Sequence, residues 1–160
     1  MKQLFEVKDI DIKFYEKNIK DFIPDKIIDI HTHIWLDKFK VKEECDDIIP
    51  VRSATWPSRV AKDNSVEDLI RTYELMFPDK QVTPLIFGDP KVEFDIELSN
   101  EYVKSSSKKY GFPSLLLTHP DWSGTELEEK ITSGGFLGSK VYLNYAKPYI
   151  PQNEIRIFDF

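Results

Sequence analysis

Two histidines, His31 and His33, carry the clearest chemical signal in the sequence. They flank Thr32 directly after the run 26–30, which is rich in β-branched residues. Side chains two residues apart on an extended strand point to the same face, so both imidazoles can reach one ion above the strand end. The spacing therefore predicts a metal site with His31 and His33 as ligands. The competing interpretation is a pair of hydrogen-bonded histidines that cap a buried strand.

Asp29 precedes the pair by the same step of two residues. In a regular strand it shares the face of the two histidines, where its carboxylate either orients an imidazole as a supporting partner of the metal site or fixes the turn. The sequence leaves both roles open.

The segments around this pair alternate between strand-like and helix-like patterns. The strand-like runs, of which the first is expected to be buried, are 26–30, 81–88, 113–118 and 136–143. The helix-like runs are 65–76, 94–110 and 125–133, with capping residues at Ser65 and Thr125 and a closing glycine at Gly111. This order predicts a parallel α/β architecture, in which sites collect at the carboxyl ends of the strands.

Two further segments do not fit the alternation. Residues 1–25 form an irregular or partly helical lead-in that Pro24 closes, and residues 36–64 form a long irregular insertion. Loops of that length within a domain tend to be functional, so the insertion is expected to cover the mouth of the site.

The motif Asp29-x-His31-x-His33 after a first strand resembles that of the amidohydrolase superfamily, and more closely its amidohydrolase-related (family 2) branch. The run from Gly135 to Leu143, with Lys140 at its centre, is similar to the fourth strand of that branch. The resemblance spans residues 27–143 and implies a TIM-type (β/α)8 barrel. About four of the eight strands are present, so residues 1–160 are expected to be the N-terminal half of a longer protein.

The resemblance also implies a function. In that family the first-strand histidines bind a divalent metal, commonly zinc, that activates water for attack on an amide, ester or lactone carbonyl. The general-base aspartate is expected beyond residue 160, so the isolated chain is expected to be inactive. The alternatives are a metal-dependent decarboxylase of the same family and a non-catalytic binding or scaffold half-barrel. Histidinol-phosphatase-like phosphoesterases and TatD-like nucleases, which also begin with His-x-His, are further alternatives.

Three other residues are candidates for substrate contact: Lys140, His119 and Trp35. Each also has a structural interpretation, as a paired lysine, a loop histidine or a packed aromatic residue. In some family members a lysine at the position of Lys140 is carboxylated and bridges two metals. The expected partners are a small-molecule substrate and either the remaining half of the barrel or a second copy of the chain.

Composition narrows the remaining possibilities. The 160 residues carry 22 Lys+Arg against 28 Asp+Glu, a net charge of −6 that disfavours nucleic acid as a partner. No apolar run approaches the roughly 20 residues of a membrane-spanning helix. The single cysteine, Cys45, lies in an acidic run that disfavours its thiolate, and the expected location is the cytoplasm.

Overall fold

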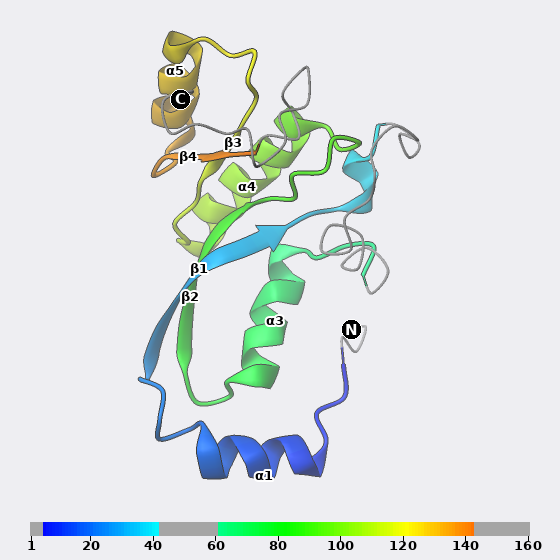
Figure 1. Ribbon diagram of the computed structural model, residues 1–160, viewed down its shortest axis with the longest axis vertical. Coiled ribbons are helices and arrows are strands. Elements are labelled where there is room, and N and C mark those ends of the chain that lie inside the picture. The colour runs from blue at the N-terminus through cyan, green and yellow to red at the C-terminus, as the bar shows by residue number, and fades with distance from the viewer. Residues whose placement is uncertain (1–4, 42–60, 143–160) are drawn as a thin grey trace, which may run out of the picture.

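The computed structural model of the chain describes residues 5–41 and 61–142, and the fold is given for those residues (Figure 1). Helices and parallel strands alternate along the chain, which confirms the predicted mixed α/β class. The elements are α1 (Asp9–Asn18), β1 (Lys26–Ile34), the short 3-10 helix η1 (Asp37–Phe39), α3 (Val66–Met76), β2 (Gln81–Gly88), α4 (Ile96–Tyr110), β3 (Leu116–Thr118), α5 (Gly124–Gly134) and β4 (Ser139–Val141).

Local capping residues fix the ends of the helices. The Ser65 hydroxyl accepts from the backbone N–H of Asp68 at 3.0 Å, and the Asp68 carboxylate accepts from the backbone N–H of Ser65 at 3.3 Å. This capping box begins α3 as predicted. Gly111 ends α4 with a φ of 72°, a left-handed conformation that glycine adopts without steric cost.

The predicted start of α5 was wrong. Ser123 caps the helix, and its side chain pairs reciprocally with Glu126, whereas Thr125 already lies inside the first turn. Both Ser123 and Thr125 have an acidic residue three positions later, so the sequence pattern fits either. The strands β3 and β4 are also shorter than predicted, while β1 runs past the expected end at Ile30 to include both histidines.

The strands form two small parallel sheets, β1–β2 and β3–β4. A bridge at Ile86 connects them in the described part of the chain. Ile86 donates from its N–H to the carbonyl of Pro113 and accepts at its own carbonyl from the N–H of Leu115, each at 3.0 Å. Within residues 5–41 and 61–142 the strands do not close into a barrel.

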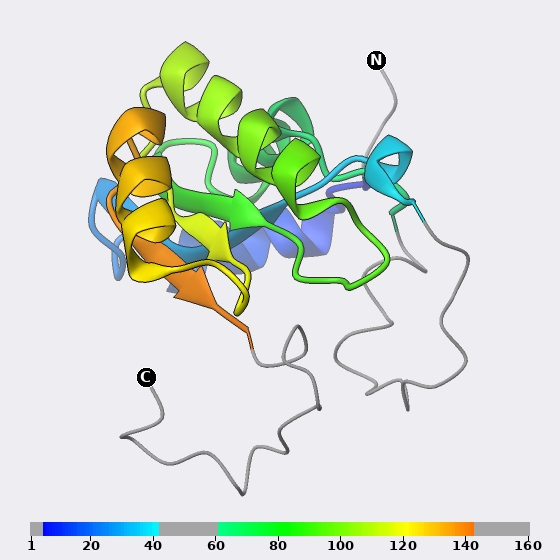
Figure 2. The same ribbon diagram turned by 90° about the horizontal axis from the view of Figure 1, so that it is seen from above.

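Helices α3 and α4 lie on one side of the strands, as the view from above shows (Figure 2). We call this the helix face of β1 and β2, and the opposite side the far face. Among the described residues, the buried side chains that form the core on the helix face are Ile34, Val66, Leu69, Ile86, Val103, Leu116 and Phe136.

The predicted burial of the first strand was wrong for its first half. Ile28 and Ile30 on the far face are each 72% exposed. The buried part of β1 is its carboxyl half, where Thr32 and Ile34 reach the helix face. A run of β-branched residues predicts a strand but does not report how many of its faces are covered.

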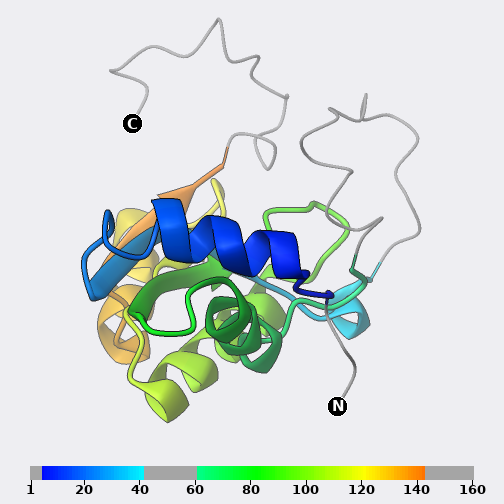
Figure 3. The same ribbon diagram turned by 90° about the horizontal axis from the view of Figure 1, so that it is seen from below.

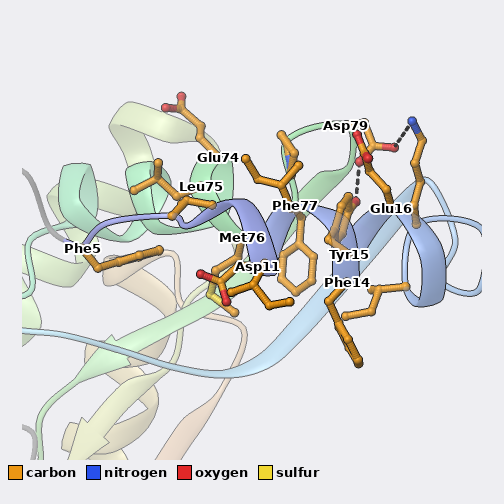
Figure 4. Close-up of a pocket in the computed structure, with 16 residues that line it drawn as sticks. Phe5, Asp11, Phe14, Tyr15, Glu16, Glu74, Leu75, Met76, Phe77 and Asp79 are labelled. Carbon is orange, nitrogen blue, oxygen red and sulfur yellow. Dashed lines mark hydrogen bonds and ion pairs between the residues drawn. The ribbon is translucent and has the colours of Figure 1, made fainter.

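Helix α1 lies across the end of the fold at which β1 begins (Figure 3). A groove of about 890 Å3 separates it from the carboxyl end of α3, and its lining is mainly apolar (Figure 4). Tyr15 of α1 donates its hydroxyl to Asp79, which lies in the turn after α3. None of the three histidines lines this groove.

Among the described residues, no helix combines the length and the apolar character needed to cross a bilayer.

Candidate metal centre

The two histidines meet at the carboxyl end of β1. The Nε2 atoms of His31 and His33 are 3.3 Å apart, and the ring centroids are 5.2 Å apart. We call these two residues the histidine pair. The structure therefore brings together the two side chains that the sequence singles out.

A β-bulge decides which face the histidine pair occupies. Asp29 lies opposite Pro84 of β2 and Thr32 lies opposite Ile86, so two residues of β1 stand against one of β2. The two residues of β1 between Asp29 and Thr32 are Ile30 and His31, and we call them the bulge. An extra residue shifts the alternation of side chains by one position, which moves every later side chain to the other face.

The contacts on each side of the bulge follow this shift. Before it, the Asp29 side chain reaches Tyr73 of α3 on the helix face. After it, Thr32 contacts the same tyrosine, and the histidine pair lies on the far face. The expectation that Asp29 shares a face with the histidines was therefore wrong, because alternation predicts it only for an unbroken strand.

Backbone groups hold His33 in place. Its Nδ1–H donates to the carbonyl of Gly88 at 2.8 Å, and its own carbonyl accepts from the Asn64 side chain at 2.8 Å. A carbonyl only accepts, so Nδ1 carries the proton and Nε2 of the neutral ring keeps its lone pair. A hydrogen bond of this kind at the distal nitrogen is the usual support of a metal-binding histidine.

Phe87 forms the floor beneath the histidine pair. It is fully buried, and its ring centroid lies 5.4 Å from that of His31 and 4.6 Å from that of His33. The side-chain nitrogen of Lys140 lies 5.0 Å from the same ring. One aromatic ring thus gathers three nitrogen-bearing side chains on the far face.

Burial is the main reason that the His33 ring is neutral near pH 7. Burial lowers the pKa of His33, opposed by its bond to the Gly88 carbonyl and by the negative charge of Asp89, and assisted by the positive charge of Lys140. A neutral imidazole is the form that binds metal. Asp89 is itself paired with Lys91 at 3.2 Å.

Tyr142 lies beside His33 of the histidine pair. Its hydroxyl lies 3.4 Å from Nε2 of His33, and burial together with the charge of Asp89 raises the pKa of Tyr142 to about 12. The phenol therefore keeps its proton at neutral pH and can donate to an acceptor beside the histidine pair.

Lys140 differs from the other half-buried lysines of the described residues. The other half-buried lysines, Lys80, Lys91, Lys104 and Lys130, each lie within ion-pair distance of a carboxylate. No ion pair of Lys140 is found in the described part of the chain, where its ammonium lies over the rings of Phe87 and Tyr142. An ammonium in this position can pair with an anion that reaches the far face.

Asp29 supports the histidine pair through the backbone. Its Oδ1 accepts from the backbone N–H of His31 at 3.1 Å, and its Oδ2 accepts from the Tyr73 hydroxyl at 2.8 Å. Of the two roles that the sequence left open, these contacts correspond to fixing the backbone turn.

Two other predicted substrate contacts lie in packed or local environments. Trp35 is only 8% exposed and donates its indole N–H to the carbonyl of Lys62 at 2.9 Å. His119 lies in the loop after β3, where its Nδ1 accepts from the backbone N–H of Asp121 at 3.3 Å. Their proposed contact with substrate stays a prediction. Cys45 and most of the 36–64 insertion lie outside the described residues.

The histidine pair fits two positions of a zinc site. Two nitrogen ligands bound at about 2.0 to 2.1 Å in a tetrahedral arrangement lie about 3.3 Å apart. The Nε2 atoms of His31 and His33 have this separation. Because Nδ1 of His33 carries the proton, Nε2 of that ring keeps a lone pair that can bind a metal ion. Within residues 5–41 and 61–142, however, no third His, Cys, Asp or Glu joins them in a metal-binding group.

Sequence reasoning missed Tyr73, Gly88 and Asp89. One signal was available for two of them, because Gly88-Asp89 ends the second strand and parallel neighbours end at the same edge of a sheet. Tyr73 lies within the helix predicted at 65–76, and nothing in the sequence connects it with Asp29.

Comparisons of the chain with models of known protein families, with curated proteins and with solved structures find no match.

Proposed function

We propose that the chain is part of a metal-dependent hydrolase in which His31 and His33 bind a divalent cation, with zinc as the best fit. The observation that carries the proposal is the 3.3 Å separation of their Nε2 atoms at the carboxyl end of a parallel strand. When bound, such a cation supplies a nucleophile from water near neutral pH and polarises a carbonyl group. The substrate class that suits this chemistry is an amide, an ester or a lactone.

The proposal assigns roles to the surrounding residues. The Gly88 carbonyl holds the tautomer of His33, and the protonated Tyr142 hydroxyl donates to an acceptor atom of the substrate. Phe87 excludes water from beneath the two imidazoles. The remaining metal ligands and the general base come from outside residues 5–41 and 61–142.

The finer architecture that we propose is a set of four (β/α) units from a TIM-type barrel. Its support is the sequential order of parallel strands, with the Ile86–Ser114 bridge linking β2 to the start of β3. In such a barrel the far face of β1 and β2 is the interior, which agrees with the apolar Ile28 and Ile30 on that face.

A second candidate is the decarboxylation of a small carboxylic acid by the same centre. The observation that favours it is the ammonium of Lys140, which shares the Phe87 ring with the histidine pair and has no carboxylate partner in the described residues. A lysine in this position can hold the carboxylate of an acidic substrate.

Metal binding is tested by titrating the chelator-treated complete natural protein with Zn2+ or Co2+ against a chromophoric chelator. We expect one ion per chain, and loss of that ion in both His31→Ala and His33→Ala. The matched control is His119→Ala, which removes a histidine on another loop and should bind like the parent. Equal binding by all three variants would refute the proposal.

Activity is tested on the complete natural protein with a panel of lactones, amides, esters and aromatic acids. We expect turnover of at least one class that chelation abolishes, that metal restores, and that His33→Ala lowers more than a hundredfold. Carbon dioxide release from the acids, with no hydrolysis of the other classes, would select the decarboxylase. Turnover that survives both chelation and His33→Ala would exclude both candidates.

A further inference from the structure

A hydrogen-bond chain connects helix α3 to the histidine pair through the backbone of β1. The Tyr73 hydroxyl donates to Oδ2 of Asp29 at 2.8 Å, and Oδ1 of the same carboxylate accepts from the N–H of His31 at 3.1 Å. The carboxylate therefore bridges a helix side chain and a strand backbone group. Both bonds are charge-assisted and are stronger than neutral ones.

The bridge lies at the bulge. The extra residue interrupts the ladder between the Asp29–Pro84 and Thr32–Ile86 pairs, and the N–H of His31 finds its acceptor in the Asp29 side chain. The carboxylate gives this exposed donor a charge-assisted partner within the protein and so stabilises the bulged conformation. Thr32, the first residue after the bulge, also lies 3.4 Å from the Tyr73 hydroxyl.

The bulge in turn determines the face on which the imidazoles lie. Without the extra residue, His31 and His33 would point with Asp29 toward α3. With it, they converge above Phe87 on the far face. A contact that stabilises the bulge therefore also affects the distance between the Nε2 atoms of His31 and His33.

We propose that Tyr73 is a positioning residue for the histidine pair, which it orients by holding Asp29 and, through Asp29, the bulge. This inference rests on the proposed function for its metal readout. The residue touches neither imidazole and lies on a helix, so its effect is transmitted only through the carboxylate and the strand backbone.

The test compares Tyr73→Phe with Tyr102→Phe. Both variants remove only a hydroxyl from a half-buried tyrosine. Tyr102 lies on α4, where its oxygen accepts from the N–H of Val66 at 2.9 Å, away from the bulge. Each substitution removes one hydrogen-bonding hydroxyl, but only the Tyr73 hydroxyl is connected to His31, through Asp29.

Two readouts are measured on each protein. The first is the dissociation constant for Co2+ and the absorption spectrum of the Co2+-loaded protein. The second is the set of imidazole 15N shifts of the metal-free protein, which report the tautomers of His31 and His33. Removing a supporting hydrogen bond of a metal site typically costs about 10- to 100-fold in affinity.

We expect Tyr73→Phe to weaken Co2+ binding about tenfold, to change its spectrum and to shift the imidazole signals, while Tyr102→Phe alters none of these. Unchanged affinity and imidazole signals in Tyr73→Phe would overturn the inference. If the parent protein binds no Co2+, the proposed function fails, and the imidazole shifts of the metal-free proteins alone decide whether Tyr73 positions the pair.

Asp29 supplies a second pair of variants if Tyr73→Phe does not fold. Asp29→Asn keeps an oxygen that can accept from the N–H of His31, whereas Asp29→Ala keeps none. We expect the imidazole shifts to change more in Asp29→Ala than in Asp29→Asn. Equal, parent-like signals in both would overturn the role of the bridge.

Discussion

The side-chain amide of Asn100 makes two hydrogen bonds with the backbone of Leu117. Its Nδ2 donates to the carbonyl of Leu117 and its Oδ1 accepts from the N–H of the same residue, each at 2.9 Å. Both residues are buried. A residue of α4 thus satisfies the two groups of β3 that an adjacent strand would satisfy in a longer ladder.

Replacing this amide should destabilise the fold. In Asn100→Ala, two buried backbone groups lose their partners, at a cost of about 2 to 4 kcal/mol in the free energy of unfolding. Urea denaturation measures the loss, and hydrogen exchange at the Leu117 amide should accelerate. Asn18→Ala, which removes a single exposed bond to the carbonyl of Phe14, is the control and should change stability little. Equal effects of the two substitutions would contradict this interpretation.

A methyl group at Gly88 should disturb both packing and His33. A Cβ there would lie 2.8 Å from Cδ1 of Leu117 and 3.0 Å from Oγ of Ser99, and both neighbours are buried. The backbone that accepts from Nδ1 of His33 would have to move. We expect Gly88→Ala to lower the free energy of unfolding by about 1 to 3 kcal/mol and to shift the imidazole signals of His33.

Gly124→Ala is the matched control for this prediction. No atom lies within 4 Å of a Cβ placed at Gly124. Alanine there should leave stability unchanged or raise it by up to about 1 kcal/mol, since it reduces the freedom of the unfolded chain. A Gly88→Ala protein as stable as Gly124→Ala would show that the edge of β2 adapts freely.

Stability of the metal-free protein should fall below neutral pH in part because of His33. Its pKa in the folded protein is lowered, chiefly by burial, from an unfolded value of about 6.5. The folded state therefore binds fewer protons than the unfolded state between these two values. The contribution of His33 to stability is complete above the unfolded pKa and is lost as the pH falls through the folded one.

Melting temperatures at pH 7.5 and pH 5.5 measure this effect. The drop between the two pH values should be smaller in His33→Gln than in the parent, while His119→Gln should retain the parent's drop. A drop of the same size in all three proteins would assign the pH dependence to other groups.

Lys140→Met should weaken the binding of small carboxylates without abolishing metal binding. The substitution keeps an apolar side chain against Phe87 and Tyr142 but removes the ammonium. We expect about a tenfold loss of affinity for a probe such as benzoate, which corresponds to one charge-assisted hydrogen bond. Calorimetry with the probe and with Zn2+ separates the two effects.

Lys130→Met is the control for that substitution. The ammonium of Lys130 also lies over an aromatic ring, 4.5 Å from Trp122, but it is paired with Glu97 at 2.7 Å. Its removal should leave benzoate binding unchanged. The same loss in both variants would indicate a general effect of net charge.

Local signals made much of the fold predictable. The capping box at Ser65 and the left-handed Gly111 are set by residues within one turn of the helix end, so the sequence places both ends of α3 and the end of α4 well. The alternation of strands and helices follows from the same local patterns. Where two caps compete, as at Ser123 and Thr125, the local pattern does not choose between them.

The site was predictable only in part. The spacing of His31 and His33 was sufficient to expect that their rings meet, and their Nε2 atoms do. The face on which they meet depends on the bulge, which Tyr73 and Asp29 support from 44 residues apart in sequence. Tertiary contacts of this kind leave no periodic signal. The exposure of Ile28 and Ile30 was missed for a related reason, since burial depends on which elements cover a strand.

The bulge limits how well such sites can be recognised from a sequence motif alone. Consider a strand with the same Asp-x-His-x-His motif that pairs with its neighbour without the extra residue opposite Leu85. Its imidazoles would point to the helix face, where they could not share an ion above the strand end. Matching the Asp-x-His-x-His motif therefore identifies candidates of two geometries that the motif itself does not distinguish. In this chain the residue that holds the bulge through Asp29 is Tyr73 of α3, which lies outside the motif.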